Sequence, residues 1–144
     1  MDRSWWVTGL TGLCVVALLP WVGRWARPDR DRRCALDGGG IQPTFRVRVV
    51  LDRRQSHEFC SLRCAELWLE ARQRPPHAVF VTDEVTTREI PASAAHYVRS
   101  SVVTNPVTRE RRHVFASPSD ALRHVRAFGG RLLVGEERPF HTEG

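Results

Sequence analysis

Lysine is absent from this 144-residue chain, and methionine occurs only at Met1. All 22 basic residues are therefore arginines, and they are scattered along the sequence instead of clustering with aromatic residues on one element. Because a nucleic-acid-binding face needs such a cluster, we expect no nucleic-acid partner, and the simplest explanation of the arginine bias is a GC-rich genome. The lone methionine also leaves no thioether donor beyond the first residue.

Signatures of the common catalytic classes are missing as well. The chain contains no G-x-S-x-G nucleophile elbow, no Walker phosphate loop and no H-E-x-x-H zinc motif. Asp83 and Glu84 follow the end of a predicted strand, but a lone acidic pair is more often a solvated turn. We therefore expect that the protein is not an enzyme, unless a cysteine acts as the nucleophile.

Cysteine is sparse, and its number is informative. Cys14 lies inside a hydrophobic segment, so Cys34, Cys60 and Cys64 remain for the rest of the chain. An odd number fits a disulfide framework poorly and a thiolate metal site better. Two alternatives stay open, namely three buried structural cysteines or a disulfide between two of them.

Residues 5–23 form an uncharged segment with tryptophans at both ends. Nineteen residues at about 1.5 Å each span about 28 Å, close to the roughly 30 Å hydrocarbon core of a bilayer. The segment is long for a signal peptide, and Leu13 before Cys14 does not fit a lipoprotein site. The sequence therefore predicts a single-pass transmembrane anchor over residues 1–25 and a polar linker over residues 26–33.

Arginines are concentrated immediately after the predicted anchor. Five lie between residues 24 and 33, whereas only Arg3 precedes the segment. By the positive-inside rule alone, this bias places the rest of the chain in the cytoplasm.

The remaining sequence predicts an α+β fold made of two β-β-α-β repeats behind the transmembrane helix. Hydrophobic patterning and turn signals predict three strands and one helix in each half. In the first repeat, residues 34–91, these elements are strands at 45–51, 57–60 and 78–81 and a helix at 61–73. In the second repeat, residues 92–138, they are strands at 98–104, 112–115 and 132–134 and a helix at 118–128. Residues 139–144 form a tail.

The two predicted repeats share residues at an offset of 56. The identical pairs are His57 and His113, Phe59 and Phe115, Ser61 and Ser117, and Ala65 and Ala121. At the same offset, alanine and aspartate stand in the second half where the first half has Cys60 and Cys64. We therefore expect one metal site, in the first repeat.

The pattern that carries chemistry is Cys34-x2-Asp37 followed by Cys60-x3-Cys64. A spacing of four at the start of a helix places two sulfurs on one face, where the helix dipole is expected to stabilise thiolates. Three thiolates suit Cu(I), and with Asp37 as fourth ligand they suit Zn(II). If copper is the metal, Asp37 is expected to hydrogen-bond a ligand instead. His57 is a weaker candidate for an additional ligand.

Several runs of this sequence resemble a known family. They are Cys34-x-x-Asp37-Gly38, Phe59-Cys60-Ser61-x-x-Cys64-Ala65, Ala78 to Asp83, Phe115-Ala116-Ser117 and Ala127 to Arg131. The cysteine pattern resembles the TRASH-like metal-binding knuckle, and the ordered runs over residues 34–134 resemble the NosL family of nitrous-oxide reductase accessory proteins. The resemblance implies a membrane-tethered Cu(I) chaperone in the periplasm, whose partners are a copper donor protein and a copper-enzyme client such as nitrous-oxide reductase.

The chain also departs from the family pattern. Family members commonly have a C-x-x-C-G-M-like run near the first cysteine, whereas here Asp37 replaces the second cysteine and Gly39 the methionine. The family implies a periplasmic domain, while the arginines after the anchor favour the cytoplasm. Two other functions remain open, a structural zinc-knuckle interaction domain and a thiol oxidoreductase using Cys60 and Cys64, although their x3 spacing differs from the C-x-x-C redox motif.

Overall fold

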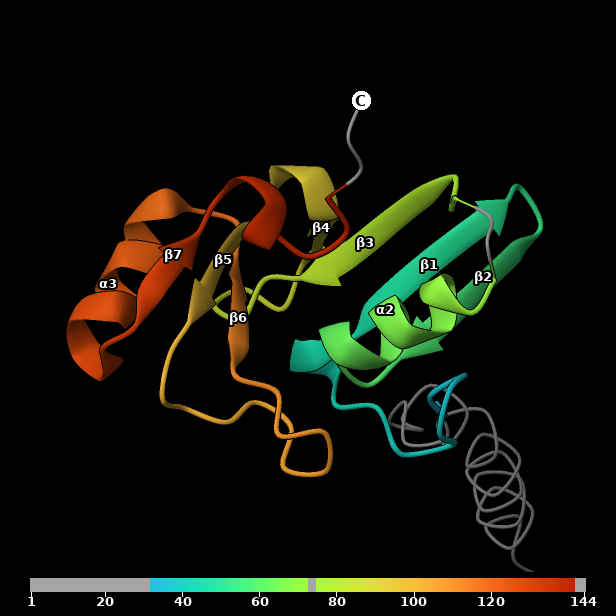
Figure 1. Ribbon diagram of the computed structural model, residues 1–144, viewed down its shortest axis with the longest axis horizontal. Coiled ribbons are helices and arrows are strands. Elements are labelled where there is room, and N and C mark those ends of the chain that lie inside the picture. Colours follow the sequence, from blue (N-terminus) through green and yellow to red (C-terminus); the bar gives the residue numbers. More distant parts are fainter. Residues whose placement is uncertain (1–31, 73–74, 142–144) are drawn as a thin grey trace, which may run out of the picture. The chain divides into compact units, whose positions relative to one another are not determined.

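The computed structural model describes residues 32–72 and 75–141. These residues form two antiparallel sheets and two α-helices, so the predicted α+β class is confirmed (Figure 1). None of the helices in this part of the chain is long and apolar enough to cross a membrane. The predicted anchor, residues 1–25, lies outside the described residues.

The first sheet has four strands in the order β2-β1-β3-β4, with β1 pairing antiparallel to both β2 and β3. Its elements in chain order are a 3₁₀ turn η1 (Pro43–Phe45), β1 (Val47–Asp52), β2 (Gln55–Phe59), α2 (Leu62–Glu70), β3 (Ala78–Thr82) and β4 (Glu89–Pro91). Helix α2 contacts β1 and β2. The short edge strand β4 was not predicted, because three residues ending in proline carry no strand pattern.

Helix α2 begins after the N-cap Ser61 and ends at Glu70, three residues before the predicted end at Gln73. The N–H of Ala71 still donates to the carbonyl of Leu67, but the N–H of Arg72 donates to Leu69, only three residues back. This tighter bond is the usual way in which a last turn closes an α-helix.

The second sheet has three strands in the order β6-β5-β7. Its first strand in the chain, β5, lies between the other two, just as β1 lies between β2 and β3 in the first sheet. Its elements are a 3₁₀ turn η2 (Ala92–Ala94), β5 (His96–Arg99), β6 (Arg112–Phe115), α3 (Pro118–Phe128), β7 (Arg131–Leu133) and a 3₁₀ turn η3 (Gly135–Glu137). Helix α3 contacts all three strands.

The predicted strand over residues 98–104 is wrong at both ends. Strand β5 stops at Arg99 because the Ser100 side chain accepts a hydrogen bond from the Val102 N–H, which competes with strand pairing. Residues 100–111 form a long loop instead, and Val103 within it is exposed. This loop becomes important at the candidate site.

Strand pairing follows the same register in the two halves. In the first half Val47 pairs with Phe59, and in the second half His96 pairs with Phe115. Both halves therefore bring the end of their second strand, and the helix N-terminus that follows, beside the start of the central strand. The predicted boundary between residues 91 and 92 stays a prediction.

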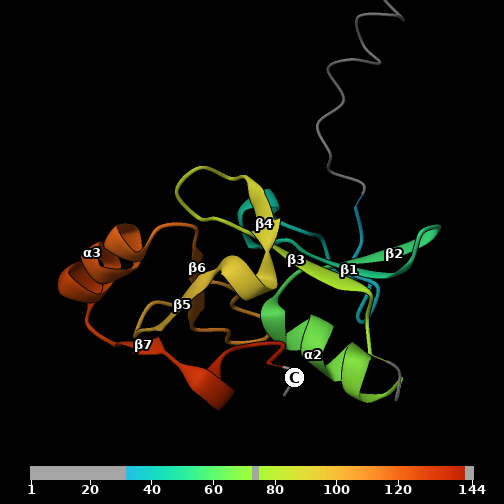
Figure 2. The same cartoon turned by 90° about the horizontal axis from the view of Figure 1, so that it is seen from above.

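Strand β5 connects two apolar clusters. Tyr97, which is almost fully buried, packs into the larger cluster with Val47 and Phe59 of the first half, while Val98 packs with Phe115 beneath α3. Because neighbouring residues of a strand point to opposite faces, one strand contributes to both clusters. The segment with β4 and η2 connects the two halves (Figure 2), and the larger cluster includes residues from both of them.

Candidate metal centre

A tight turn places Cys34 beside the end of β2. The N–H of Cys34 donates to the carbonyl of Gly39, and the N–H of Gly38 donates to the carbonyl of Cys34, both at 2.8 Å. Gly38 has a φ of +71°, a conformation that favours glycine. The N–H of Ala35 donates to the carbonyl of Glu58 at 2.9 Å, which fixes this turn to β2 two residues before Cys60.

The other two cysteines lie where β2 passes into α2. Cys60 directly follows the last residue of β2, and Cys64 lies in the first turn of α2. The hydroxyl of Ser61 accepts a hydrogen bond from the N–H of Cys64 at 3.2 Å, which caps the helix and fixes this turn. The sulfurs of Cys60 and Cys64 are 3.6 Å apart.

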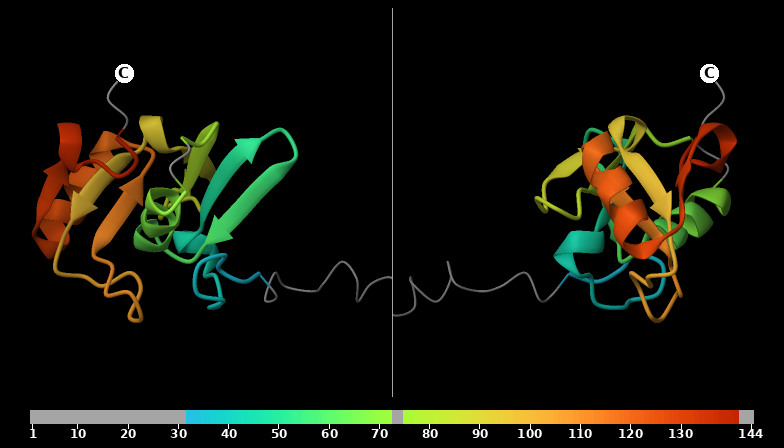
Figure 3. Two further views of the ribbon diagram at one scale, coloured as in Figure 1. Left: turned by 45° about the vertical axis from the view of Figure 1, so that its right-hand side comes forward. Right: turned by 90° about the vertical axis from the view of Figure 1, so that its left-hand side faces the viewer.

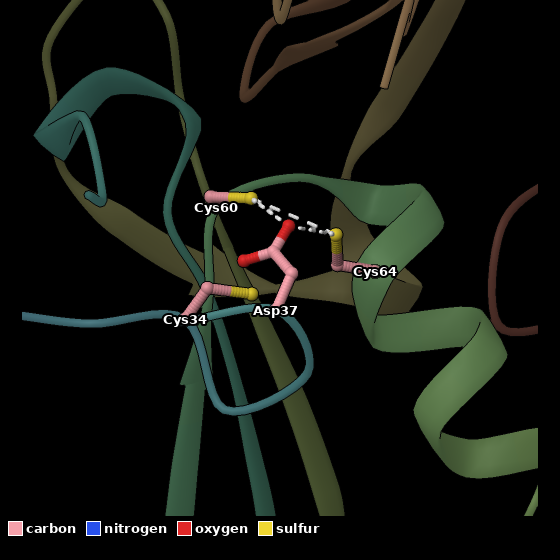
Figure 4. A group of neighbouring side chains, drawn as sticks. All are labelled: Cys34, Asp37, Cys60 and Cys64. Carbon is pink, nitrogen blue, oxygen red and sulfur yellow. Dashed lines mark hydrogen bonds between the residues drawn. The ribbon is translucent and has the colours of Figure 1, made fainter. Parts of the chain in front are cut away.

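These elements bring four donor side chains together (Figure 4). The sulfurs of Cys34, Cys60 and Cys64 and a carboxylate oxygen of Asp37 all lie within 4.8 Å of one another, and the three cysteines are buried. Asp37 Oδ2 is 3.7 Å from the sulfur of Cys60 and 3.5 Å from that of Cys64. Its Oδ1 accepts a hydrogen bond from the N–H of Gly39 at 2.8 Å, so the backbone orients the carboxylate toward the thiols.

The spacing of these donors fits a single metal ion. Tetrahedral coordination with metal–sulfur bonds of about 2.3 Å and metal–oxygen bonds of about 2.1 Å has sulfur–sulfur edges of about 3.8 Å and sulfur–oxygen edges of about 3.6 Å. The observed distances are 3.6 Å between the sulfurs of Cys60 and Cys64 and 3.5–3.7 Å from those sulfurs to Asp37. The donor atoms of all four residues lie within 4.8 Å of one another, so these three thiols and one carboxylate could hold one soft or borderline metal ion if the Cys34 sulfur closes to the same spacing.

The charges of the cluster differ from the sequence-based expectation. The Gly39 N–H, together with the three thiols, lowers the pKa of Asp37, so this group is ionised at neutral pH. Burial raises the pKa of both Cys60 and Cys64. Burial therefore opposes the thiolate form that the helix dipole was expected to favour. A metal ion that binds here must displace these protons.

His57, the weaker predicted ligand, is not among the clustered donors. Its ring packs against that of Trp68 on α2, with ring centroids 4.7 Å apart. The corresponding residues of the second half, His113 and His124, also pack together, with centroids 4.1 Å apart. The recurrence of this strand–helix ring contact indicates a packing role for His57.

The second half of the chain supports the cysteine cluster through residues that sequence reasoning missed. Asn105, in the long loop before β6, donates from Nδ2 to the carbonyl of Cys60 at 3.4 Å. Glu110 accepts a hydrogen bond from the N–H of Arg63, in the first turn of α2, at 3.0 Å. Arg112 makes a bidentate pair with Glu66 of α2 at 2.8 Å and also bonds Glu110. The Asn105-Pro106 pair is a turn signal, but it does not indicate which element the loop contacts.

The acidic pair Asp83 and Glu84 was expected to be a solvated turn; the chain does turn here, but the pair is not solvated. Asp83 is 1% exposed, and its Oδ1 accepts a hydrogen bond from the N–H of Ala116 at 3.0 Å. Glu84 accepts from the N–H of Val114 at 3.0 Å and lies 2.9 Å from Nδ1 of His113. Both carboxylates therefore bind the second sheet to the first.

Glu110 should make stability depend on pH. Although burial opposes ionisation, the hydrogen bonds and charge of Arg112 outweigh it and lower the pKa of Glu110. The stabilisation is thus complete above the unfolded-state pKa of about 4.3 and is lost as the pH falls toward the folded-state value. We expect Glu110→Gln to cost up to about 3 kcal/mol at pH 7 and less at acidic pH, because it leaves Arg112 paired only with Glu66.

Urea denaturation at several pH values measures this effect. Glu137→Gln is the matched control, because Glu137 pairs with Arg131 at an exposed position and its loss should change little. Equal losses for the two variants at pH 7 would contradict the role assigned to Glu110.

Together, the fold and the four donors define a small α+β domain with a candidate site for a soft metal ion. No protein-family model and no curated protein matches the chain. Among solved structures, the chain is similar to the crystal structure of the copper chaperone NosL from Shewanella denitrificans, with a TM-score of 0.59 and 21% identity. The match covers 72% of this chain and 87% of that chain. The predicted resemblance to NosL is thus confirmed at the level of the fold.

Proposed function

We propose that this protein is a metal-binding accessory protein that carries Cu(I) and delivers it to a copper enzyme. One observation carries the proposal: Cys34, Asp37, Cys60 and Cys64 place their donor atoms within 4.8 Å of one another, in a domain with the fold of a copper chaperone. Cu(I) is the cargo of such a protein and not a catalytic cofactor. Three thiolates are the donors that Cu(I) prefers.

The location of the site favours delivery over a purely structural role. The cysteines are buried, but Asp37 is exposed, so one side of the site is open to an exchanging ligand. The apolar core beside the site includes Val47, Val49 and Phe59, each at most 1% exposed. This core can hold the sheet and α2 together without a metal ion, whereas a structural zinc domain depends on its ion for folding.

A chelator experiment separates the proposed carrier from a structural zinc domain. After exhaustive chelation, we expect the far-UV circular dichroism and the cooperative unfolding transition to remain, because the core does not need the ion. The apoprotein should then take up one Cu(I) per chain in an anaerobic titration against a competing Cu(I) chelator. Loss of folding on chelation would support a structural zinc site, and failure to bind Cu(I) would refute the proposed function.

The thiol oxidoreductase alternative is not favoured by the site. The cysteines have x3 spacing, and burial raises the pKa of both Cys60 and Cys64, whereas redox-active thiols have a low pKa.

We further propose that residues 5–23 anchor the chain in the membrane and that the metal-binding domain faces the periplasm. Its partners would then be a copper donor and a copper-enzyme client, for which nitrous-oxide reductase is the family precedent.

A further inference from the structure

The metal cluster opens into a hollow between the two halves of the domain. The hollow has a volume of about 150 Å³, and Asp37 and Cys60 lie in its wall. One side is formed by residues 39–45 and the other by residues 104–107. The segment before β1 and the loop between β5 and β6 extend on the same side of the domain (Figures 1 and 3). The hollow therefore gives an incoming ligand access to two of the four metal donors, Asp37 and Cys60.

The long loop before β6 is fixed over this hollow. Asn105 accepts hydrogen bonds at Oδ1 from the N–H groups of Val107, at 2.9 Å, and Thr108, at 3.2 Å, while its Nδ2 bonds the carbonyl of Cys60. These bonds fix the tip of the loop, where the side chain of Val107 is 85% exposed. Leu36, beside Asp37 in the cysteine turn, is also exposed, at 42%. Exposed aliphatic side chains thus stand on both sides of the cluster.

The segments around the hollow also carry a surplus of positive charge. Arg63, Arg109 and Arg111 are exposed there. Glu110 and Glu66 both pair with Arg112, and the three exposed arginines outnumber the ionised Asp37 carboxylate in the wall of the hollow. A partner that approaches this face therefore meets these arginines around an apolar rim.

We propose that this face is the docking surface for an acidic protein partner that inserts a thiolate-bearing segment into the hollow and exchanges Cu(I) with the cysteine cluster. The inference rests on the proposed function and adds the chemistry of the partner. Opposite charge at the rim accelerates encounter, and the hollow admits the incoming sulfur beside Asp37 and Cys60. Transfer needs no redox step: two Cu–S bonds to the partner form while the three Cu–S bonds to Cys34, Cys60 and Cys64 break. The two partner thiols give up their protons, and the three released cysteines take up protons from them and from water.

Two synthetic peptides test the charge of the partner. Both contain one Cys-x-x-Cys segment, flanked by four glutamates in one peptide and by four lysines in the other. The full chain, in a neutral detergent and loaded with Cu(I), is mixed with each peptide under anaerobic conditions. At low salt we expect transfer to the glutamate peptide to be at least about tenfold faster, and we expect the difference to shrink at high salt.

Matched variants locate the surface. We expect Arg109→Glu and Val107→Ser each to slow transfer to the glutamate peptide several-fold while leaving Cu(I) affinity unchanged. The controls Arg126→Glu, on the exposed face of α3, and Val134→Ser, which follows β7 and is 67% exposed, should leave the rate unchanged. Equal rates for the two peptides, or equal effects of test and control variants, would overturn the inference. Failure of the wild-type chain to bind Cu(I) would instead refute the proposed function.

Discussion

Replacing Cys60 and Cys64 together by serine should abolish high-affinity Cu(I) binding. The two sulfurs lie 3.6 Å apart, and both face Asp37, so together they form one side of the proposed coordination polyhedron. Structural Zn(II) binds zinc-finger peptides with about 10–16 kcal/mol through four ligands, which is about 3 kcal/mol for each ligand and sets the scale expected for one thiolate here. Each single serine variant should therefore weaken binding about 100-fold, and the double variant far more.

Competition against a Cu(I) chelator of known affinity measures these losses. Cys14→Ser is the matched control, since Cys14 belongs to the predicted anchor and should not bind the ion. His57→Ala should also keep full Cu(I) affinity, because its ring packs on Trp68. Full affinity in the Cys60→Ser, Cys64→Ser double variant would show that the site lies elsewhere.

Asp37→Ala should separate copper from zinc. A carboxylate is a hard donor that completes a tetrahedral Zn(II) site, whereas three thiolates satisfy Cu(I) without it. We expect the variant to lose about 100-fold in Zn(II) affinity but less than about tenfold in Cu(I) affinity. The turn should persist, because the Cys34–Gly39 and Gly38–Cys34 backbone bonds do not involve the Asp37 side chain.

The measurement is a pair of titrations, one with each metal, on wild type and variant. Asp52→Ala is a suitable control, because Asp52 also accepts backbone hydrogen bonds in a tight turn but lies outside the cluster. A large loss of Cu(I) affinity in Asp37→Ala would show that the carboxylate is itself a copper ligand. Equal losses of Zn(II) and Cu(I) affinity would show that Asp37 does not discriminate between the two metals.

The donors of the candidate site could be predicted because their spacing is local. Cys60 and Cys64 are separated by one helical turn, and the glycines after Asp37 are typical of the tight turn that contains Cys34. The helix N-caps are local in the same way: the side chains of Ser61 and Ser117 accept hydrogen bonds from the N–H groups of Cys64 and Ser119, and serine is a favoured N-cap residue. Such features depend on a few neighbouring residues, so a single sequence contains them.

The supporting residues could not be predicted because their roles depend on long-range packing. Glu110 reaches the first turn of α2 only because the loop before β6 is long, and nothing in residues 100–111 indicates where that loop folds. Asp83 and Glu84 look like any exposed acidic pair until the second sheet supplies N–H donors. The raised pKa of Cys60 likewise follows from burial, which a helix-dipole argument omits.

X-ray absorption spectroscopy of the Cu(I)-loaded chain tests the central claim most directly. The account predicts one copper ion per chain with three sulfur neighbours at about 2.3 Å and no imidazole scattering. In Cys34→Ser, one of the three sulfurs should disappear from the spectrum while Cys60 and Cys64 remain bound. A histidine signal in the wild-type spectrum, or a spectrum unchanged by Cys34→Ser, would contradict a site built from these three cysteines.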